Sequence, residues 1–184
     1  MKLKKITIKN YKNLNFVDCK LPDSSIIAFI GNNGSGKSNM LENILNTFYL
    51  AHKLTNSTNE ISSIPYIFNY LYSIDENEHQ IEFQGNNFFY YKNGKKNIKQ
   101  LKNALPKAIF TYYAGETKRL NAYSDFMKQE YYDFLKKQSS DIAELKFVTT
   151  FSLKDFPLAF FASYVFDTPE FAKIKNLLHF DSID

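Results

Sequence analysis

Residues 31–38 read Gly-Asn-Asn-Gly-Ser-Gly-Lys-Ser, a full match to the pattern G-x-x-x-x-G-K-[ST]. The apolar run Ile26–Ile30 precedes this segment and has no polar face, which predicts a strand buried on both sides. After the glycine-rich segment, apolar residues recur at helical spacing, which predicts a helix over residues 38–50. The apolar face predicted for that helix is Met40, Leu41, Ile44, Leu45 and Phe48. The residues predicted to face away are Glu42, Asn43, Asn46 and Thr47. A glycine-rich turn between a buried strand and an amphipathic helix is typical of a phosphate-binding loop in an α/β fold.

Each part of this loop has a physical purpose. Glycines let the backbone turn tightly and approach a phosphate, and the N–H groups at the start of the 38–50 helix favour an anion. Lys37 is the predicted catalytic residue, reaching the β- and γ-phosphates, and the Ser38 hydroxyl is the predicted Mg²⁺ ligand. The predicted nucleotide-binding residues are Gly31, Asn32, Asn33, Gly34, Ser35, Gly36, Lys37, Ser38 and Asn39. The alternative is a glycine-rich strand-to-helix turn with an incidental Gly-Lys-Ser.

Composition narrows the class of protein. The chain has 184 residues, of which 44% are hydrophobic, enough for a buried core and too many for a disordered tail. The single cysteine, Cys19, excludes an internal disulfide. Lysines interrupt the first ten residues, and the longest apolar run, Pro157–Phe166, is too short to cross a bilayer. We therefore expect a cytoplasmic protein with no membrane partner. Its 23 basic and 19 acidic residues do not by themselves indicate a nucleic-acid binder.

The remaining elements follow from residue patterns. The predicted strands are Ile6–Lys9, Phe16–Leu21, Gln80–Phe83, Asn87–Tyr91 and Ala108–Tyr113. The predicted helices are Asn121–Gln138, Pro157–Phe166 and Pro169–Leu178. Asn10–Asn15 is a predicted turn, Lys53–Ser63 a predicted loop, and Asn93-Gly94 a predicted hairpin turn. Ile67–Tyr72 fits either a strand or a short helix.

Two segments near the N-terminus resemble one family. The opening Ile-Thr-Ile-Lys-Asn-Tyr-Lys-Asn-Leu at 6–14 is similar to the first strand and turn of RecF/SMC-type ATPases, with Lys12 where arginine is common. The Gly31–Ile44 segment, with Asn39 after Ser38, resembles the Walker A region of the same family. Together these motifs cover about the first 45 residues. More loosely, residues 112–120 resemble a segment of RecF-like AAA ATPases linked to restriction and anti-phage systems.

The resemblance implies an α/β P-loop NTPase fold. Residues 1–184 would be the N-terminal part of a single ATP-binding domain, the N-terminal portion of an ABC/SMC-type ATPase head with a mixed sheet and helices. The family implies ATP and Mg²⁺ as cofactors and a homodimer of heads that sandwiches ATP. It implies ATP hydrolysis in the complete protein, a role in DNA repair or anti-phage defence, and DNA and an effector nuclease as partners.

Two further motifs of the family have only weak counterparts. Tyr164–Asp167 is the best Walker B candidate, but Thr168 stands where a glutamate is usual. The end of a helix before Pro169 is an equally good explanation of these residues. Ala114-Gly115-Glu116 with Arg119-Leu120 is a degenerate match to a signature motif, or a strand-to-helix turn. Either way, Glu116 and Arg119 could face the nucleotide or a partner head. We therefore expect the true Walker B and signature motifs beyond this chain.

Other patterns favour simpler explanations. His52, His79 and His179 lack metal-ligand spacing, and a dipole contact at the end of the loop helix explains His52. Six lysines lie beside aromatic residues around the Asn93-Gly94 hairpin and fit either a nucleic-acid backbone or a solvated surface. They are Lys92, Lys95, Lys96, Lys99, Lys102 and Lys107.

Two alternative functions remain open. One is a nucleotide-binding module without its own turnover, which the missing Walker B glutamate favours. The other is an ABC transporter ATPase subunit, which Asn39 and the lysine-rich opening strand disfavour. A GTPase is disfavoured because no Asn-Lys-x-Asp motif is present.

Overall fold

The chain is described by a computed structural model that covers residues 1–56, 65–85, 87–112 and 147–151. Between these last two ranges it also describes Leu120, Ala122, Tyr123, Asp125, Lys128, Tyr132 and Lys136. The chain divides into two units, Met1–Ile109 and Phe110–Asp184. The phosphate-binding loop lies in the first.

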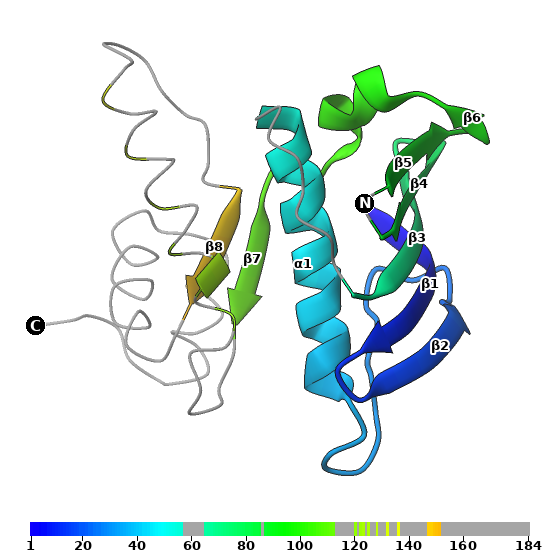
Figure 1. Cartoon of the computed structure of the whole chain (residues 1–184), viewed down its shortest axis with the longest axis vertical. Coiled ribbons are helices and arrows are strands. Elements are labelled where there is room, and N and C mark those ends of the chain that lie inside the picture. The colour runs from blue at the N-terminus through cyan, green and yellow to red at the C-terminus, as the bar shows by residue number, and fades with distance from the viewer. Residues whose placement is uncertain are drawn as a thin grey trace, which may run out of the picture. The chain divides into compact units, whose positions relative to one another are not determined.

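The first unit is built on an antiparallel sheet of six strands (Figure 1). The strands are β1 (Lys2–Tyr11), β2 (Leu14–Lys20), β3 (Ile67–Ile74), β4 (Asn77–Gln84), β5 (Asn87–Lys92) and β6 (Lys95–Lys96). Their order is β2-β1-β3-β4-β5-β6. Ile8 pairs with Val17 of β2 on one side and with Phe68 of β3 on the other, and Ile8 and Phe68 are fully buried. The strands predicted at Ile6–Lys9, Phe16–Leu21, Gln80–Phe83 and Asn87–Tyr91 are confirmed, with bounds shifted by a few residues.

Two expected turns are also confirmed. The predicted turn at Asn10–Asn15 is narrower in the structure, because Tyr11 pairs with Leu14 and only Lys12 and Asn13 form the turn. At the second turn, Asn93 and Gly94 have φ values of 48° and 74°. Positive φ at both central residues is the requirement of the type I′ hairpin that Asn-Gly favours. The undecided segment Ile67–Tyr72 is a strand, since it alternates between buried and half-buried residues in β3.

The helix that follows the loop, α1 (Lys37–Asn56), packs on this sheet (Figure 1). Phe48 is fully buried, and its ring meets those of Tyr70 and Tyr72 edge-on, with centroids 6.4 and 5.4 Å away. Leu45 and Ala51 are buried on the same helix. Edge-to-face packing of aromatic rings adds to the stabilisation from burial alone. The predicted helix is thus confirmed and extends six residues past position 50.

The predicted polar face of this helix is wrong in part. Glu42, Asn43 and Thr47 are buried, whereas the predicted core residue Leu41 is 52% exposed. Some of the buried polar atoms have partners: the Tyr70 hydroxyl donates to Asn43 Oδ1 over 2.6 Å, whereas Asn43 Nδ2 has no hydrogen-bond partner among the described residues. Thr47 Oγ1 donates to the Asn43 carbonyl of its own helix. A buried polar side chain is tolerated when it is hydrogen-bonded, so tertiary partners have shifted the buried face away from the one that hydropathy predicts.

The predicted buried strand Ile26–Ile30 is also wrong. This segment forms no strand, and Ile26 and Ile30 are 82% and 94% exposed. A central strand needs hydrogen-bonded neighbours on both edges. Among the described residues, no strand pairs with this segment.

Other elements were not predicted or fall partly outside the described residues. The 3₁₀ helix η1 (Ile98–Ala104) was missed; the Tyr72 hydroxyl donates to its Ala104 carbonyl over 2.8 Å. The strand β7 (Ile109–Tyr112) lies within the predicted strand Ala108–Tyr113. It pairs with β8 (Val148–Phe151), which was not predicted. The described residues of the predicted helix Asn121–Gln138 are helical. The predicted helices Pro157–Phe166 and Pro169–Leu178 lie outside the described residues.

Candidate functional site

The loop before α1 has the backbone that its glycines predict. Gly34 and Gly36 have φ values of 84° and 95°, in the left-handed region where a side chain is strained. Residues 31–35 are exposed to solvent, and α1 begins at Lys37. The loop therefore presents its backbone outward, directly beside a helix N-terminus.

Space around Gly36 adds a second requirement for glycine. A Cβ atom added there would lie 2.6 Å from Leu14 Cδ2 and 3.0 Å from Asn13 Oδ1. An added Cβ at Gly34 would meet nothing within 4 Å, so only its backbone conformation calls for glycine there. A side chain at Gly36 would therefore collide with residues of the β1–β2 turn, whereas a side chain at Gly34 would extend into open space.

Lys37 folds back over the loop. Its Nζ donates to the carbonyl oxygens of Gly31 and Asn32, at 2.7 and 2.8 Å. An ammonium group has three donors, and these contacts use two of them. The positive charge is therefore held within reach of the loop backbone, where a phosphate would lie.

The start of α1 adds backbone N–H groups beside the loop. The first turn of a helix leaves its N–H groups without intrahelical acceptors, and here that turn contains Lys37, Ser38 and Asn39. The first bond closing the turn is from Met40 N to Gly36 O, at 2.8 Å. Backbone N–H groups, an ammonium and a hydroxyl are the donors and ligand that a phosphate with Mg²⁺ requires, so these residues fit the group that the motif implies.

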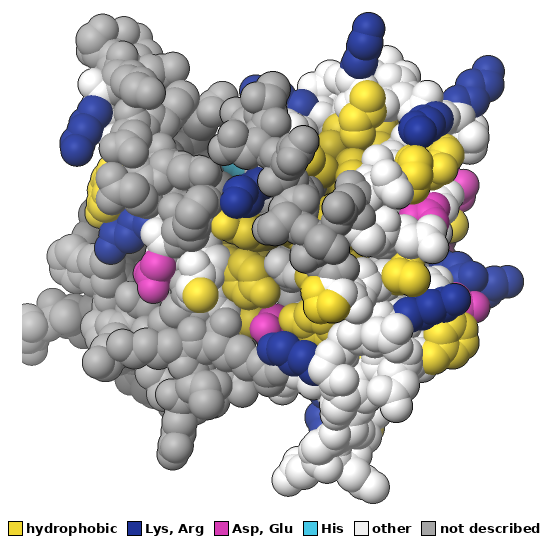
Figure 2. Space-filling view, viewed as in Figure 1, with side chains coloured by type: hydrophobic (Ala, Val, Ile, Leu, Met, Phe, Trp, Pro, Cys, Tyr) yellow, Lys and Arg dark blue, Asp and Glu magenta, His cyan; other side chains and the backbone are white. Residues whose placement is uncertain are grey.

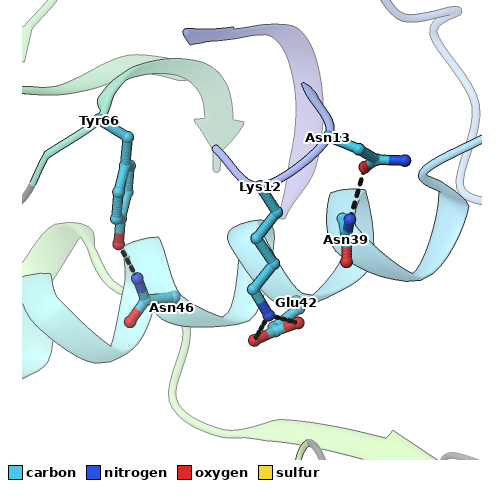
Figure 3. Close-up of polar contacts among 6 residues, drawn as sticks. All are labelled: Lys12, Asn13, Asn39, Glu42, Asn46 and Tyr66. Carbon is cyan, nitrogen blue, oxygen red and sulfur yellow. Dashed lines mark hydrogen bonds and ion pairs between the residues drawn. The ribbon is translucent and has the colours of Figure 1, made fainter. Parts of the chain in front are cut away.

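The β1–β2 turn holds this site from the side (Figure 3). Lys12 Nζ contacts both carboxylate oxygens of Glu42, at 2.6 and 2.7 Å, and the Glu42 side chain is only 8% exposed. Asn13 Nδ2 donates to the Gly34 carbonyl at 2.8 Å. Asn39 Nδ2 in turn donates to Asn13 Oδ1 at 2.5 Å. The sheet is therefore joined to both the loop and the helix by polar contacts.

Sequence reasoning missed Asn13 and Glu42 as neighbours of the loop. The pairs Asn13–Asn39 and Lys12–Glu42 span 26 and 30 residues, which no local periodicity can reveal. One signal was present: the opening segment 6–14 and the loop segment 31–44 carry the same family resemblance. Segments that share a family pattern are good candidates for contact.

A further polar pair joins the sheet to the middle of α1. Asn46 Nδ2 donates to the Tyr66 hydroxyl (Figure 3). The Tyr66 ring packs edge-on against that of Tyr11, with centroids 4.8 Å apart. Tyr11 ends β1, immediately before the turn that holds the loop. The turn is thus anchored on both the aromatic core and the helix.

Of the three histidines, the structure describes His52 and His79. Among the described residues, no group of three or more His, Cys, Asp or Glu side chains could hold a metal ion. Burial, and then the charge of Lys102, lowers the pKa of His52 to about 4, so this ring is neutral at neutral pH. The predicted dipole contact, which needs a charged ring, is therefore not what holds His52. Burial, followed by Lys92, also lowers the pKa of His79, whose Nδ1 lies 2.8 Å from the Tyr90 hydroxyl.

A hollow of about 490 Å³ lies at the other end of α1, away from the loop. Its lining residues are Leu54, Thr55, Phe88, Ile98, Lys99, Leu101 and Lys102. Among the described residues that line this hollow there is no Asp, Glu or His, and its polar side chains are Thr55, Lys99 and Lys102.

Comparison with known proteins now decides the family. The protein-family model described as AAA ATPase domain matches residues 1–177 of this chain. The chain belongs to the AAA ATPase domain family. The P-loop ATPase fold and the family assignment made from the sequence are thereby confirmed. No curated protein matches the chain.

One solved structure similar to this AAA ATPase domain comes from work on the structural biochemistry of ATP-driven dimerization and DNA-stimulated activation of SMC ATPases. It is 16% identical, with a TM-score of 0.39, and the match covers 76% of this chain and 100% of the other. At so low a TM-score, the assignment depends on the family match.

The other predicted motifs of this AAA ATPase domain lie outside the described residues. These are the signature-like residues Ala114, Gly115, Glu116 and Arg119 and the Walker B candidate Tyr164–Asp167. Within the part that the structure describes, no helix is long and apolar enough to span a membrane. The structure thus brings together the loop, Lys37, Ser38 and Asn39, with Asn13 and the Lys12–Glu42 pair beside them.

Proposed function

We propose that residues 31–39 of this AAA ATPase domain bind Mg·ATP, and that residues 1–184 are the N-terminal part of a single ATP-binding domain. The observation that carries the proposal is the position of Lys37, whose ammonium lies over the loop carbonyls at the N-terminus of α1. Lys37 would exchange these carbonyls for β- and γ-phosphate oxygens. The N–H groups of residues 36–38 would hold the phosphates, since they end the loop and open the helix.

The remaining residues have roles that follow from their chemistry. The Ser38 hydroxyl would hold Mg²⁺, which when bound bridges phosphate oxygens and offsets their charge. Asn32, Asn33 and Ser35 are exposed on the loop and would border the phosphates. Asn39, held by Asn13, would border the site from the first turn of α1.

Hydrolysis would need groups from outside this loop. Glu42 is the carboxylate nearest to the loop in sequence, but both of its oxygens are engaged by Lys12. A carboxylate held in this way is poorly suited to orient an attacking water. We therefore propose that turnover requires the Walker B and signature residues of the complete protein, in a homodimer of heads.

Binding without turnover is the second candidate function, and the engagement of Glu42 by Lys12 favours it for this chain alone. A single-turnover assay with a slight excess of chain over ATP separates the two. Hydrolysis well above the rate in buffer, lost in Lys37→Ala, would remove the second candidate. ATP recovered intact after binding would support it.

The test of nucleotide binding is the affinity of the parent chain and two lysine variants for Mg·ATP, measured by titration calorimetry. Lys37→Ala should weaken binding at least 100-fold and leave the fold intact, because its contacts are with loop carbonyls near the surface. Lys20→Ala, which removes an exposed lysine of β2, is the matched control and should bind as the parent does. Equal affinity of Lys37→Ala and parent would contradict the proposal.

DNA is the proposed partner, in repair or in anti-phage defence with an effector nuclease in the cytoplasm. The lysines around β6 and η1 support DNA as that partner (Figure 2). Residues 85–115 contain no Asp or Glu, and Lys95, Lys96, Lys99, Lys102 and Lys107 are exposed. Lys96 Nζ lies 4.5 Å from the centre of the Phe89 ring. Lysines beside aromatic rings, in a stretch without acids, suit a nucleic-acid backbone.

Fluorescence anisotropy with a DNA duplex tests this partner. Lys95→Glu/Lys96→Glu should weaken binding and reduce the slope of log K against log salt by about 0.9 for each phosphate that the variant no longer neutralises. Lys20→Glu is the control outside this lysine surface. An unchanged slope in the double variant would exclude these two lysines from the DNA interface.

A further inference from the structure

The β1–β2 turn contacts the phosphate-binding loop and its helix through three consecutive residues, of which Figure 3 draws Lys12 and Asn13. Lys12 pairs with Glu42 of α1, and Asn13 bonds to Gly34 and Asn39. The next residue, Leu14, stands against Gly36. The turn therefore meets the loop at two glycines and α1 within its first two turns.

Asn13 uses both ends of its amide. Its Nδ2 donates to the Gly34 carbonyl and its Oδ1 accepts from Asn39 Nδ2. A carbonyl oxygen can only accept a hydrogen bond, so the nitrogen of Asn13 must face Gly34 and its oxygen must face Asn39. One side chain thus connects the glycine turn of the loop to the first turn of α1.

The loop needs such a contact to hold one conformation. Gly34 and Gly36 have the largest backbone freedom of any residue type, and both adopt left-handed φ values here. Asn13 holds the Gly34 carbonyl, and on the other side of the same peptide Ser35 N donates to Asn32 O at 3.2 Å. With both sides of this peptide bonded, the directions of the following N–H groups are set.

We propose that Asn13 is a positioning residue for the nucleotide: it fixes the Gly34–Ser35 peptide and Asn39 so that the N–H groups of residues 36–38 face one phosphate. The inference rests on the proposed binding of Mg·ATP at residues 31–39. Asn13 acts through the loop and does not itself contact the nucleotide. Fixing a binding site before the ligand arrives lowers the ordering cost of binding, so the loss of Asn13 weakens affinity.

The first test is the affinity for Mg·ATP of Asn13→Ala, with Asn15→Ala as the control. Asn15 is exposed on the adjacent strand. Two surface hydrogen bonds of ordinary strength correspond to about a tenfold loss of affinity in Asn13→Ala. Asn13→Asp keeps the acceptor for Asn39 but loses the donor to Gly34, and we expect it to bind at least as weakly as Asn13→Ala. A folded Asn13→Ala that binds as the parent does overturns the proposal.

The second test separates positioning from stability and needs no nucleotide. In ¹⁵N-correlated spectra of the free chain, the amide resonances of Gly34 and Gly36 should move in Asn13→Ala and stay in place in Asn15→Ala. A purely structural role would lower the unfolding midpoint and leave these resonances and the affinity of the folded chain unchanged.

The two proposals fail in different ways. If the parent binds no Mg·ATP, or if Lys37→Ala binds as well as the parent, nucleotide binding at this loop is wrong. The glycine resonances then still report on Asn13. Gly34 and Gly36 resonances at their parent positions in Asn13→Ala would show that Asn13 does not set the loop, whatever the ligand.

Discussion

The segments on the two sides of the phosphate-binding loop are both apolar in sequence, but they differ in the structure. Phe48 of α1 is fully buried, whereas Ile30, the residue just before the loop, is 94% exposed. A helix satisfies its own backbone hydrogen bonds and needs only one face to pack, while a strand needs neighbouring strands to which its backbone can hydrogen-bond. Local residues are therefore enough for α1 to form a helix, whereas Ile26–Ile30 would form a sheet strand only with a partner strand beside it.

The largest effect is expected on the helical side. Phe48→Ala removes a fully buried ring that packs on Tyr70 and Tyr72, and it should lower the free energy of unfolding by about 3–5 kcal/mol. Urea denaturation followed by circular dichroism measures this loss. Leu41→Ala, on an exposed part of the same helix, should cost about 1 kcal/mol or less. Similar losses in the two variants would contradict the packing described for α1.

Lys12→Ala is expected to lower the free energy of unfolding by less, about 1–3 kcal/mol. It removes the ammonium group that pairs with the carboxylate of Glu42, a side chain that is only 8% exposed. The double variant Lys12→Ala/Glu42→Gln should recover part of the loss, since it also removes the carboxylate charge that Lys12 offsets in the parent. The same urea experiment applies. If the double variant is less stable than Lys12→Ala, the charge of Glu42 is not the cause of the stability lost in Lys12→Ala.

His52 tests the burial of the far end of α1 through pH. Its pKa is lowered from 6.5 to about 4 in the folded chain, so between these values the unfolded chain binds more protons. Stability from this group is fully present above pH 6.5 and is lost as the pH falls toward 4. After allowance for the solvent exposure of the ring, the loss is roughly 1 kcal/mol. His52→Gln should flatten unfolding free energy against pH in this window, and an unchanged slope would contradict the burial of this ring.

The smallest effect is expected before the loop. Ile30→Asn should change the free energy of unfolding by about 0.5 kcal/mol or less, because the side chain is 94% exposed. This variant sharpens the contrast with Phe48→Ala. A loss above about 2 kcal/mol would mean that Ile26–Ile30 is buried, as its apolar sequence predicts.

Patterns within a short stretch of sequence predicted the elements that such a stretch can form by itself. Alternation predicted β1 and β2, the Asn93-Gly94 pair predicted the hairpin, and the glycine motif predicted the loop and the start of α1. The errors concern partners distant in sequence. Asn43 is buried because Tyr70, 27 residues away, donates to it, and hydropathy counts it as a surface residue.

The candidate site divides in the same way. Residues 31–39 follow from one motif, since their chemistry depends on local backbone geometry. Asn13 and Glu42 could not be found from the motif, because they join the site only when β1, β2 and α1 pack together. Fold-level contacts of this kind are where a single sequence carries least information.

The most direct measurement is an NMR titration of the ¹⁵N-labelled chain with Mg·ATP. Nucleotide binding at the loop predicts that the largest amide shifts fall within residues 31–39, with smaller ones at Asn13. Shifts centred on the hollow between Leu54 and Lys102, with the loop resonances unmoved, would contradict it.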